Sequence, residues 1–510
     1  MSDWSAGYVT DIGYNYGYYA ELNPLRLNLP FLQAGLAPAS IGNACELGFG
    51  QGVSLNFHAA GSALSWWGSD FNPSQVLYAR TLAAASGAPA HLFDLPFAEF
   101  CQRQDLPDFD FIALHGVWTW ISEANRQVIV DFIDRKLNSG GVLYVSYYTL
   151  PSWVAMLPLR DLLLLYEQRL TPRSASWAQR IEESLGFAEQ LLACQPAFAQ
   201  ANPQVASKLQ TIRQNKNYAY LSHEYFNRDW QPITFSRMAE WLSPARLNYV
   251  CSAHPADNLY QERLSAAQVS FLAQISDPIV RETTLDLLVN RQYRRDYWVK
   301  GSRALSSAEA LHLWQQQSLV LTVSADKLPQ PTAQSNPSLP AACFVLLRLL
   351  ADLQVHSIGS LLPTLRAAGL TLEQIQEAIH KLLANNFVQA AHSSENIAHA
   401  RAMADRLNGL LLDWVQYSDT FGFLLSPVTG GGIALSKIER LFLSAIVQGH
   451  QEPREWARFA DPCLNALGQR LVDAQGNTLL SSAQQVAQLT LLAEEFRLHK
   501  LPLCQALQIV

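Results

Sequence analysis

The first half of the sequence predicts a doubly wound, mostly parallel α/β sheet, and the second half predicts a mainly helical region. Three observations support this prediction. Short apolar segments alternate with helical segments between residues 43 and 148, as in parallel strands joined by crossover helices. A glycine-rich loop directly follows the first apolar segment. Beyond a polar stretch with four prolines at 327–340, helical patterns continue to the C-terminus.

Five strands and their helices can be placed in chain order from the apolar runs. The first strand starts at Asn43 and ends before Gly48, and a helix opens at Val53. The other strands are expected at 63–70, 90–94, 109–116 and 140–148, and the other helices at 25–36, 73–86 and 123–137. Open parallel sheets bind ligands at the carboxyl ends of their strands. We therefore expect the site at the residues that end these strands, Gly48, Asp70, Asp94 and His115.

A helical insertion interrupts the predicted sheet after its fifth strand. The stretch 151–216 is rich in Ala, Gln and Leu. A helix at 237–242 and a sixth strand at 247–252 follow, and 318–324 is the candidate for a seventh, antiparallel strand. The basic stretch 290–301 lies between them, and its pattern is typical of a solvated helix end or hairpin.

The region after the proline-rich stretch predicts a winged-helix-like unit at 341–391. Its elements are three helices at 342–353, 358–368 and 371–385 and a strand-like segment at 387–390. A third helix that reads DNA would carry Arg, Lys, Asn or Gln, whereas this one carries Glu373 and Glu377 against one lysine. We therefore interpret the unit as a protein-contact or packing module.

The composition excludes several classes of protein. Apolar residues make up 49% of the 510 residues and charged residues 15%, which indicates globular domains with large cores. A formal charge of −7 and the lack of a Lys/Arg-rich run argue against nucleic acid as a partner. The seven cysteines form no pair at metal-ligand spacing, which predicts a reducing compartment and no metal site. With neither a secretory signal nor an apolar run of membrane-spanning length, we expect a cytoplasmic protein without membrane insertion.

The glycine-rich loop and two acids suggest a nucleoside cofactor. Gly48, Gly50 and Gly52 allow the backbone to turn sharply and to approach a ligand closely. This spacing alone is equally compatible with a turn that binds nothing. Asp70, however, lies about twenty residues beyond the glycines, where the diol of a ribose meets its carboxylate partner. Asp94 lies one strand further along, where it can meet an adenine amino group.

Together these residues resemble the signature of the class I S-adenosylmethionine-dependent methyltransferases. The matching motifs are Glu46-x-Gly48-x-Gly50-x-Gly52, Gly68-Ser-Asp70-Phe-Asn-Pro73 and Phe93-Asp94-Leu-Pro-Phe. The resemblance implies a Rossmann-like sheet with S-adenosyl-L-methionine as its cofactor. It implies cofactor contacts from Glu46, Gly48, Phe49, Gly50, Gly52, Asp70, Phe71, Asp94, Leu95, His115 and Gly116.

A second resemblance covers the segments 217–226 and 294–300. They are similar to the methyltransferase regulatory domain of a bacterial subset that includes the outer-membrane-protein lysine methyltransferases of rickettsiae, and this likeness suggests a homodimer. The predicted domains are a cofactor-binding catalytic domain at 1–150, a helical insertion and candidate dimerisation element at 151–216, a regulatory region that completes the sheet at 217–326, a linker at 327–340 and a C-terminal domain at 341–510.

The residues after the fourth strand bear on the methyl acceptor. Base methyltransferases commonly carry Asn/Asp-Pro-Pro-Tyr there, and this chain has His115-Gly-Val-Trp-Thr-Trp120, which disfavours a nucleobase. Aromatic rings would attract an ammonium group, unless they belong to the core, and the candidates are Tyr14, Tyr16, Trp118 and Trp120. A lysine must lose its proton before it attacks a methyl group. The candidate proton acceptors are His115, His223 and Glu224.

These observations predict an S-adenosylmethionine-dependent methyltransferase that acts on lysine in a protein substrate. A first alternative is methylation of a small molecule or glycan during natural-product or surface-polysaccharide synthesis. A second alternative is a non-catalytic protein that keeps the cofactor fold as a sensor or assembly subunit. The intact set of three glycines with Asp70 and Asp94 speaks against loss of cofactor binding.

Overall fold

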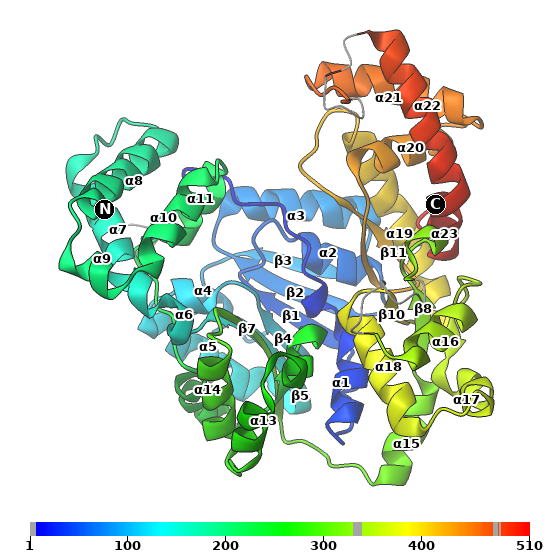
Figure 1. Cartoon of the computed structure of the whole chain (residues 1–510), viewed down its shortest axis with the longest axis horizontal. Coiled ribbons are helices and arrows are strands. Elements are labelled where there is room, and N and C mark those ends of the chain that lie inside the picture. The colour runs from blue at the N-terminus through cyan, green and yellow to red at the C-terminus, as the bar shows by residue number, and fades with distance from the viewer. Residues whose placement is uncertain (1–6, 330–338, 473–477, 479–480) are drawn as a thin grey trace.

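A seven-stranded sheet forms the centre of the protein in a computed structural model (Figure 1). The structure describes residues 7–329, 339–472, 478 and 481–510. The strands are β1 (Asn43–Leu47), β2 (Ser65–Asp70), β3 (Ala90–Asp94), β4 (Phe109–Leu114), β5 (Leu137–Tyr148), β6 (Leu247–Ser252) and β7 (Tyr293–Lys300). Their order is β3-β2-β1-β4-β5-β7-β6. Strands β1 to β5 are parallel and β7 is antiparallel to β5 and β6, which confirms the predicted fold class.

Helices cover both faces of this sheet because side chains alternate along each strand. On β1, Cys45 and Leu47 belong to a core that includes α5 (Glu123–Lys136) and α12 (Phe235–Leu242). Ala44, the residue before Cys45, belongs to the core of the opposite face. The helices on that face are α1 (Asn28–Gln33), α2 (Val53–Ala60) and α3 (Pro73–Ser86). The sheet is therefore packed between two hydrophobic cores, one on each face, and these cores fix the positions of the strand ends that carry the predicted site.

The prediction for the seventh strand was wrong. Residues 318–321 form β8 (Ser318–Leu321), which pairs with β9 (His356–Ser357) and β10 (Val388–Ala391) in a separate three-stranded sheet. The place in the main sheet belongs to β7, within the stretch that was expected to be solvated. Arg294 of β7 is only 2% exposed. Its guanidinium forms ion pairs with Glu282, Asp286 and Asp296 at 2.7 to 2.9 Å. Paired in this way, a charged strand can be buried.

A bundle of helices follows β5 and has a hydrophobic core of its own (Figure 1). Its main helices are α7 (Leu157–Leu170), α8 (Trp177–Ala193), α9 (Ala197–Ala201), α10 (Gln204–Gln214) and α11 (Tyr218–Tyr225). The bundle is followed by α12, β6, α13 (Ala266–Ala273), α14 (Pro278–Leu288), β7 and α15 (Ser307–Gln316). The domain boundaries and the dimerisation role of the bundle stay predictions.

The C-terminal half is mainly helical, as predicted. It contains α16 (Ala341–Leu349), α17 (Ile358–Ala367), α18 (Leu372–Ala384), α19 (Ser394–Trp414), the hairpin of β11 (Phe423–Ser426) and β12 (Gly431–Ala434), α20 (Lys437–Val447), α21 (Pro453–Ala466), α22 (Ser482–Glu495) and α23 (Leu501–Ala506). The winged-helix assignment stays a prediction, and most of the predicted linker lies outside the described residues. Among the residues that the structure describes, no helix has the length and apolarity to cross a membrane.

Candidate cofactor and acceptor site

The glycine-rich loop turns between β1 and α2 with a backbone that only glycine adopts easily. Gly48, Gly50 and Gly52 have φ angles of +72°, +58° and +65°. A Cβ atom on Gly48 would lie 2.7 Å from a methyl of Val117, and one on Gly52 would lie 2.5 Å from Cβ of Ala79. Side chains at these two positions would therefore clash. The loop lies close against its neighbours and leaves space on the side of Gly50.

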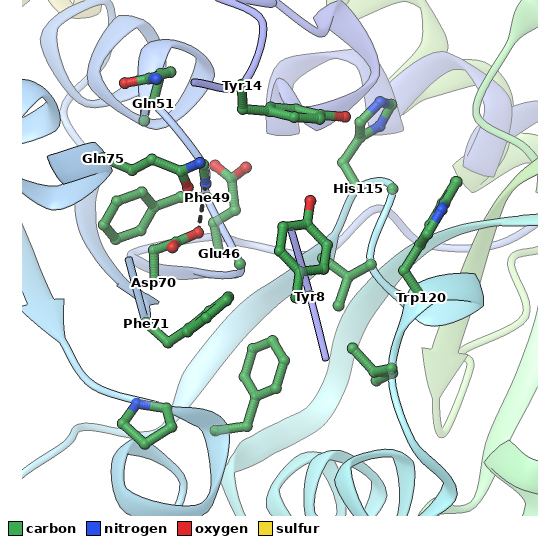
Figure 2. Close-up of a pocket in the computed structure, with 18 of the residues that line it drawn as sticks. Tyr8, Tyr14, Glu46, Phe49, Gln51, Asp70, Phe71, Gln75, His115 and Trp120 are labelled. Atoms are coloured by element: carbon green, nitrogen blue, oxygen red, sulfur yellow. Dashed lines mark hydrogen bonds between the residues drawn. The ribbon is translucent and has the colours of Figure 1, made fainter. Parts of the chain in front are cut away.

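Asp70, at the end of β2, is tied to this loop. Its carboxylate accepts a hydrogen bond from the backbone N–H of Gly50 at 2.8 Å (Figure 2). It accepts a second from the backbone N–H of Asn72 at 2.9 Å. Burial nevertheless raises the pKa of Asp70 to about 7. The carboxylate thus lies next to the loop in a poorly hydrated position, where it can accept hydrogen bonds from a ligand's hydroxyl groups.

A cavity of about 160 Å³ opens at the carboxyl ends of the strands. The predicted residues that line it are Tyr14, Glu46, Gly48, Phe49, Gly50, Gly52, Asp70, Phe71, Leu95, His115 and Gly116. Asp94 does not line it, because its side chain is exposed, although it lies opposite Asp70 in the β2–β3 register. Most of the predicted cofactor residues are therefore brought together, and their role in binding stays a prediction.

Glu46 gives the cavity a second buried carboxyl group. Burial and the neighbouring Asp70 raise its pKa to about 8, and Oε2 has no hydrogen-bond partner among the described residues. A cationic ligand would stabilise the ionised form. S-adenosyl-L-methionine fits this donor and acceptor set, because it has an ammonium group, a sulfonium and a ribose diol. Phe71, Leu95 and Phe97 add apolar walls that suit an adenine ring.

The N-terminal segment crosses the cavity with Tyr8 and Tyr14 (Figure 2). It also adds Tyr19 to the lining. The Tyr19 ring stacks on His115 with centroids 3.7 Å apart, and His115 Nδ1 lies 2.7 Å from the hydroxyl of Tyr144. Burial lowers the pKa of His115 to about 4, so the imidazole is neutral at neutral pH. His115 therefore presents a neutral ring to the cavity.

Tyr16 and Trp118, two of the candidate aromatic residues, lie outside the cavity. Tyr16 points toward α3 and packs edge-on against Tyr78 at 4.9 Å. Trp118 is fully buried in the core beside α5, where Arg126 donates a hydrogen bond to its carbonyl oxygen. Trp120, two residues further, does line the cavity. The aromatic wall therefore consists of Tyr8, Tyr14 and Trp120.

A second, smaller cavity adjoins the first. It shares Tyr8, Tyr14, Gly116 and Trp120 with the first cavity and adds Tyr220, His223 and Glu224. The structure thus brings together the distant candidates of the acceptor side, although α11, which carries His223 and Glu224, lies more than a hundred residues beyond His115.

Several residues that line the main cavity were not predicted. They are Tyr8, Asn15, Gly17, Tyr19, Gln51, Ser54, Gln75, Pro96, Phe97, Val117, Ile121, Ser122, Asn125 and Asp229. The N-terminal segment carries a run of tyrosines, Tyr14, Tyr16, Tyr18 and Tyr19, but the sequence does not indicate which of these rings point into the cavity. Nowhere in the described ranges do three His, Cys, Asp or Glu side chains gather to hold a metal ion.

The strand order with an antiparallel β7, the glycine loop and the acid that ends β2 define a class I methyltransferase fold. Residues 217–300 match the family model described as predicted methyltransferase regulatory domain. The chain is 34% identical over 513 residues to the uncharacterized protein sll1526 from Synechocystis sp. (strain ATCC 27184 / PCC 6803 / Kazusa), which covers 99% of both chains. It belongs to one family with that protein, within the S-adenosylmethionine-dependent methyltransferases that carry this regulatory domain.

Rickettsial proteins are also similar. The uncharacterized protein RP789 from Rickettsia prowazekii (strain Madrid E) is 24% identical over 286 residues, 54% of this chain and 49% of that protein. The structure of PKMT2 from Rickettsia typhi in complex with AdoHcy superposes with a TM-score of 0.69 at 16% identity, covering 95% of this chain and 98% of PKMT2. The fold is therefore shared over nearly the whole length, including the C-terminal half.

Proposed function

We propose that this methyltransferase transfers a methyl group to the amine of a lysine side chain in a protein substrate. One observation carries the proposal: the cavity that holds two buried carboxyl groups at the glycine loop continues, past Tyr8, Tyr14 and Trp120, into a smaller cavity with a further carboxylate. The first part suits the cofactor and the second suits a cation. The resemblance of two segments to rickettsial lysine methyltransferases and the likeness to PKMT2 support this choice of acceptor.

The proposed roles follow from position and chemistry. S-adenosyl-L-methionine, when bound, supplies an electrophilic methyl group. Glu46 would pair with a cationic group and Asp70 would accept hydrogen bonds from the ribose hydroxyls. Asp94, which is exposed outside the cavity on the neighbouring strand, is proposed to meet the adenine amino group. Gly48, Gly50 and Gly52 admit the ligand close to the backbone. Aligning the acceptor and excluding water then provide most of the rate enhancement.

Aromatic rings on the acceptor side support a cationic substrate. Tyr8, Tyr14 and Trp120 line both cavities, and the face of an aromatic ring attracts an ammonium by about 0.5 to 2 kcal/mol. A dry aromatic passage also lowers the pKa of a lysine amine, since burial disfavours the charged form.

We further propose that the protein forms a homodimer through the helical bundle, which light scattering would check. We also propose a cytoplasmic location.

Calorimetry tests the cofactor part of this proposal. The parent protein is expected to bind S-adenosyl-L-methionine, and Asp70→Ala is expected to bind about 10-fold more weakly or worse, since it loses charge-assisted hydrogen bonds. The exposed Asp105→Ala serves as a control with parent affinity. Absence of binding heat in the parent, or equal affinity in Asp70→Ala, would show that the cavity is not the cofactor site.

Labelled cofactor tests the acceptor. The protein is incubated with methyl-labelled S-adenosyl-L-methionine and a bacterial lysate, and label is expected in acid-precipitated protein and, after hydrolysis, in methyllysine. Label found only in the soluble small-molecule fraction would contradict a protein substrate and would indicate a metabolite or glycan as the methyl acceptor. Label on protein in another amino acid would contradict lysine as the acceptor.

A further inference from the structure

The smaller cavity is built by two parts of the chain that the family comparison treats separately. Tyr8, Tyr14, Gly116 and Trp120 come from the catalytic part and line both cavities. Glu224 comes from α11, which lies inside residues 217–300, the segment matched as a regulatory domain. The two cavities therefore meet at residues that they share, and the carboxylate at the far side belongs to the regulatory domain.

Glu224 is held rigidly in this position. Its side chain is buried, with the residue 6% exposed, and the hydroxyl of Tyr148 at the end of β5 donates a hydrogen bond to Oε1. The charge of Lys208 of α10 acts on the Glu224 carboxyl, and its Nζ lies 3.9 Å from the ring centre of Trp153. A carboxylate that faces aromatic rings in a small cavity is suited to an ammonium group.

We propose that the regulatory domain completes the catalytic site: its helix α11 supplies Glu224, which takes the proton from the acceptor amine before methyl transfer. This inference rests on the proposed function, because it assumes that S-adenosyl-L-methionine occupies the larger cavity. It assigns to the regulatory domain a direct part in the chemistry.

The proton and electron balance of the step is simple. An N–H bond of the ammonium breaks, its electron pair stays on nitrogen, and the proton forms an O–H bond with the Glu224 carboxylate. The lone pair of the neutral amine then forms the new N–C bond with the methyl carbon. The C–S bond breaks, and its electron pair goes to sulfur, which leaves as a neutral thioether. The product is a methylammonium group beside a protonated Glu224.

The surroundings of Glu224 bring the pKa of its carboxyl group close to neutral pH, which suits a proton acceptor. Burial raises its pKa to about 7, while the hydrogen bond from Tyr148 and the charge of Lys208 act in the opposite direction. A proton acceptor works best when its pKa is near the working pH. The titratable groups that face Glu224 are Tyr8, Tyr14, Tyr148, Lys208, Tyr220 and Tyr225.

The two histidines are less suited to the role. Burial lowers the pKa of His115 to about 4, and its Nδ1 is engaged with Tyr144. Burial also lowers the pKa of His223, and its Nε2 bonds to the carbonyl oxygen of Ile12. Burial lowers the pKa of both imidazoles and raises that of Glu224, so the carboxylate is the better proton acceptor.

Glu224→Gln tests the inference, because it keeps the shape of the side chain and removes the base. Transfer of tritiated methyl to poly-L-lysine is expected to fall by about 100-fold or more, while affinity for S-adenosylhomocysteine in calorimetry stays at the parent value. His223→Gln is the competing variant, and the exposed Glu183→Gln on α8 is the control. Parent turnover in Glu224→Gln, or a loss confined to His223→Gln, would overturn the inference.

Tyr148→Phe provides a second test that a merely structural role would not reproduce. It removes the hydrogen bond that lowers the pKa of Glu224, so the acidic limb of the rate profile is expected to move to higher pH. Infrared difference spectra of the protein without substrate contain carboxyl bands of both Asp70 and Glu224 that titrate near pH 7. In Tyr148→Phe one of these bands, that of Glu224, should titrate at higher pH while the Asp70 band stays in place, and Glu224→Gln should lack the band that moves. If neither band moves, the inference is overturned. If the parent protein does not bind S-adenosyl-L-methionine, that result would instead contradict the proposed methyltransferase function.

Discussion

At the scale of single residues, Glu46 and Asp70 give the main cavity two buried carboxyl groups beside the glycine loop. Their positions were predictable from the motif, because an acid before the first glycine and an acid after the second strand recur at fixed spacing. Their raised pKa values were not predictable, because the burial of Glu46 depends on side chains from the N-terminal segment such as Tyr19. Asp94 differs from these two acids, because its spacing also fits the motif but its side chain is exposed instead of buried.

The first prediction concerns the proton of Glu46. Its pKa of about 8 means that it is largely protonated at pH 7 in the free protein, and a cationic cofactor favours the ionised form, so binding should release a proton. Calorimetry at pH 7 in two buffers of different ionisation enthalpy measures this release. We expect less release and about 10-fold weaker binding in Glu46→Gln, and parent values in the exposed Glu99→Gln.

The same shift has a defined effect on stability. Because the folded pKa of Glu46 is raised, its neutral form is favoured by the fold, and the protein without cofactor loses stability as the pH rises from the ordinary value of 4.5 to about 8. Glu46→Gln should flatten this part of the profile of melting temperature against pH. Equal proton release and an unchanged profile in the variant would contradict a buried, protonated Glu46.

At the scale of elements, the parallel strands were predictable and β7 was not. The strands that end at Asp70 and Asp94 are short, apolar and followed by helices, so periodicity located them to within two residues. Strand β7 carries Arg294, Arg295 and Asp296, and a charged run normally indicates a solvated element. Its burial is stabilised by carboxylates of α14, a contact that periodicity does not reveal.

Strand β7 also anchors the segment that crosses the cofactor cavity. Arg295 forms an ion pair with Glu21 at 2.8 Å, and the hydroxyl of Tyr297 donates a hydrogen bond to the carbonyl oxygen of Glu21 at 2.8 Å. His254 lies 3.6 Å from the same carboxylate. Because Tyr19 precedes Glu21 by two residues and stacks on His115, the regulatory domain holds one end of the N-terminal segment that lines the cavity.

The second prediction follows from this anchor. Arg295→Ala is expected to raise hydrogen exchange at residues 7–22 and to weaken S-adenosylhomocysteine binding by about 10-fold, since a buried charge on Glu21 loses its partner. Arg303→Ala is the control, because Arg303 pairs with Glu309 on the surface. Unchanged exchange in Arg295→Ala would mean that Tyr297 and His254 suffice to hold the segment.

At the scale of the whole molecule, the C-terminal half and the catalytic sheet share one hydrophobic core. Val53 and Phe57 of α2 and Leu82 of α3 pack with residues of α19, including Leu407 and Leu411. Helix α19 lies beside α3 and α2 (Figure 1). The composition predicted large cores and the proline-rich stretch predicted a boundary, but neither indicated that this core spans the boundary. The helices that hold the cofactor loop therefore rest on the C-terminal half.

The third prediction tests this shared core. Leu407 is fully buried, and Leu407→Ala is expected to cost about 2 to 5 kcal/mol of unfolding free energy. Thermal melting should remain a single transition, and S-adenosylhomocysteine should raise its midpoint in the parent and in the variant. Leu491→Ala, at a residue 56% exposed, should change stability by less than about 0.5 kcal/mol. Two separate transitions would show that the halves unfold independently.

The alternation of side chains in the N-terminal segment limits how its length can vary. Asn15, Gly17 and Tyr19 line the cofactor cavity, whereas Tyr16 packs on α3 and Tyr18 packs on Phe423 of β11. In an extended chain, loss or gain of one residue exchanges the two faces. A shift here would turn the inward rings toward the C-terminal half and the outward rings into the cavity. Among related chains, substitutions in this stretch should therefore be common and single-residue insertions or deletions rare.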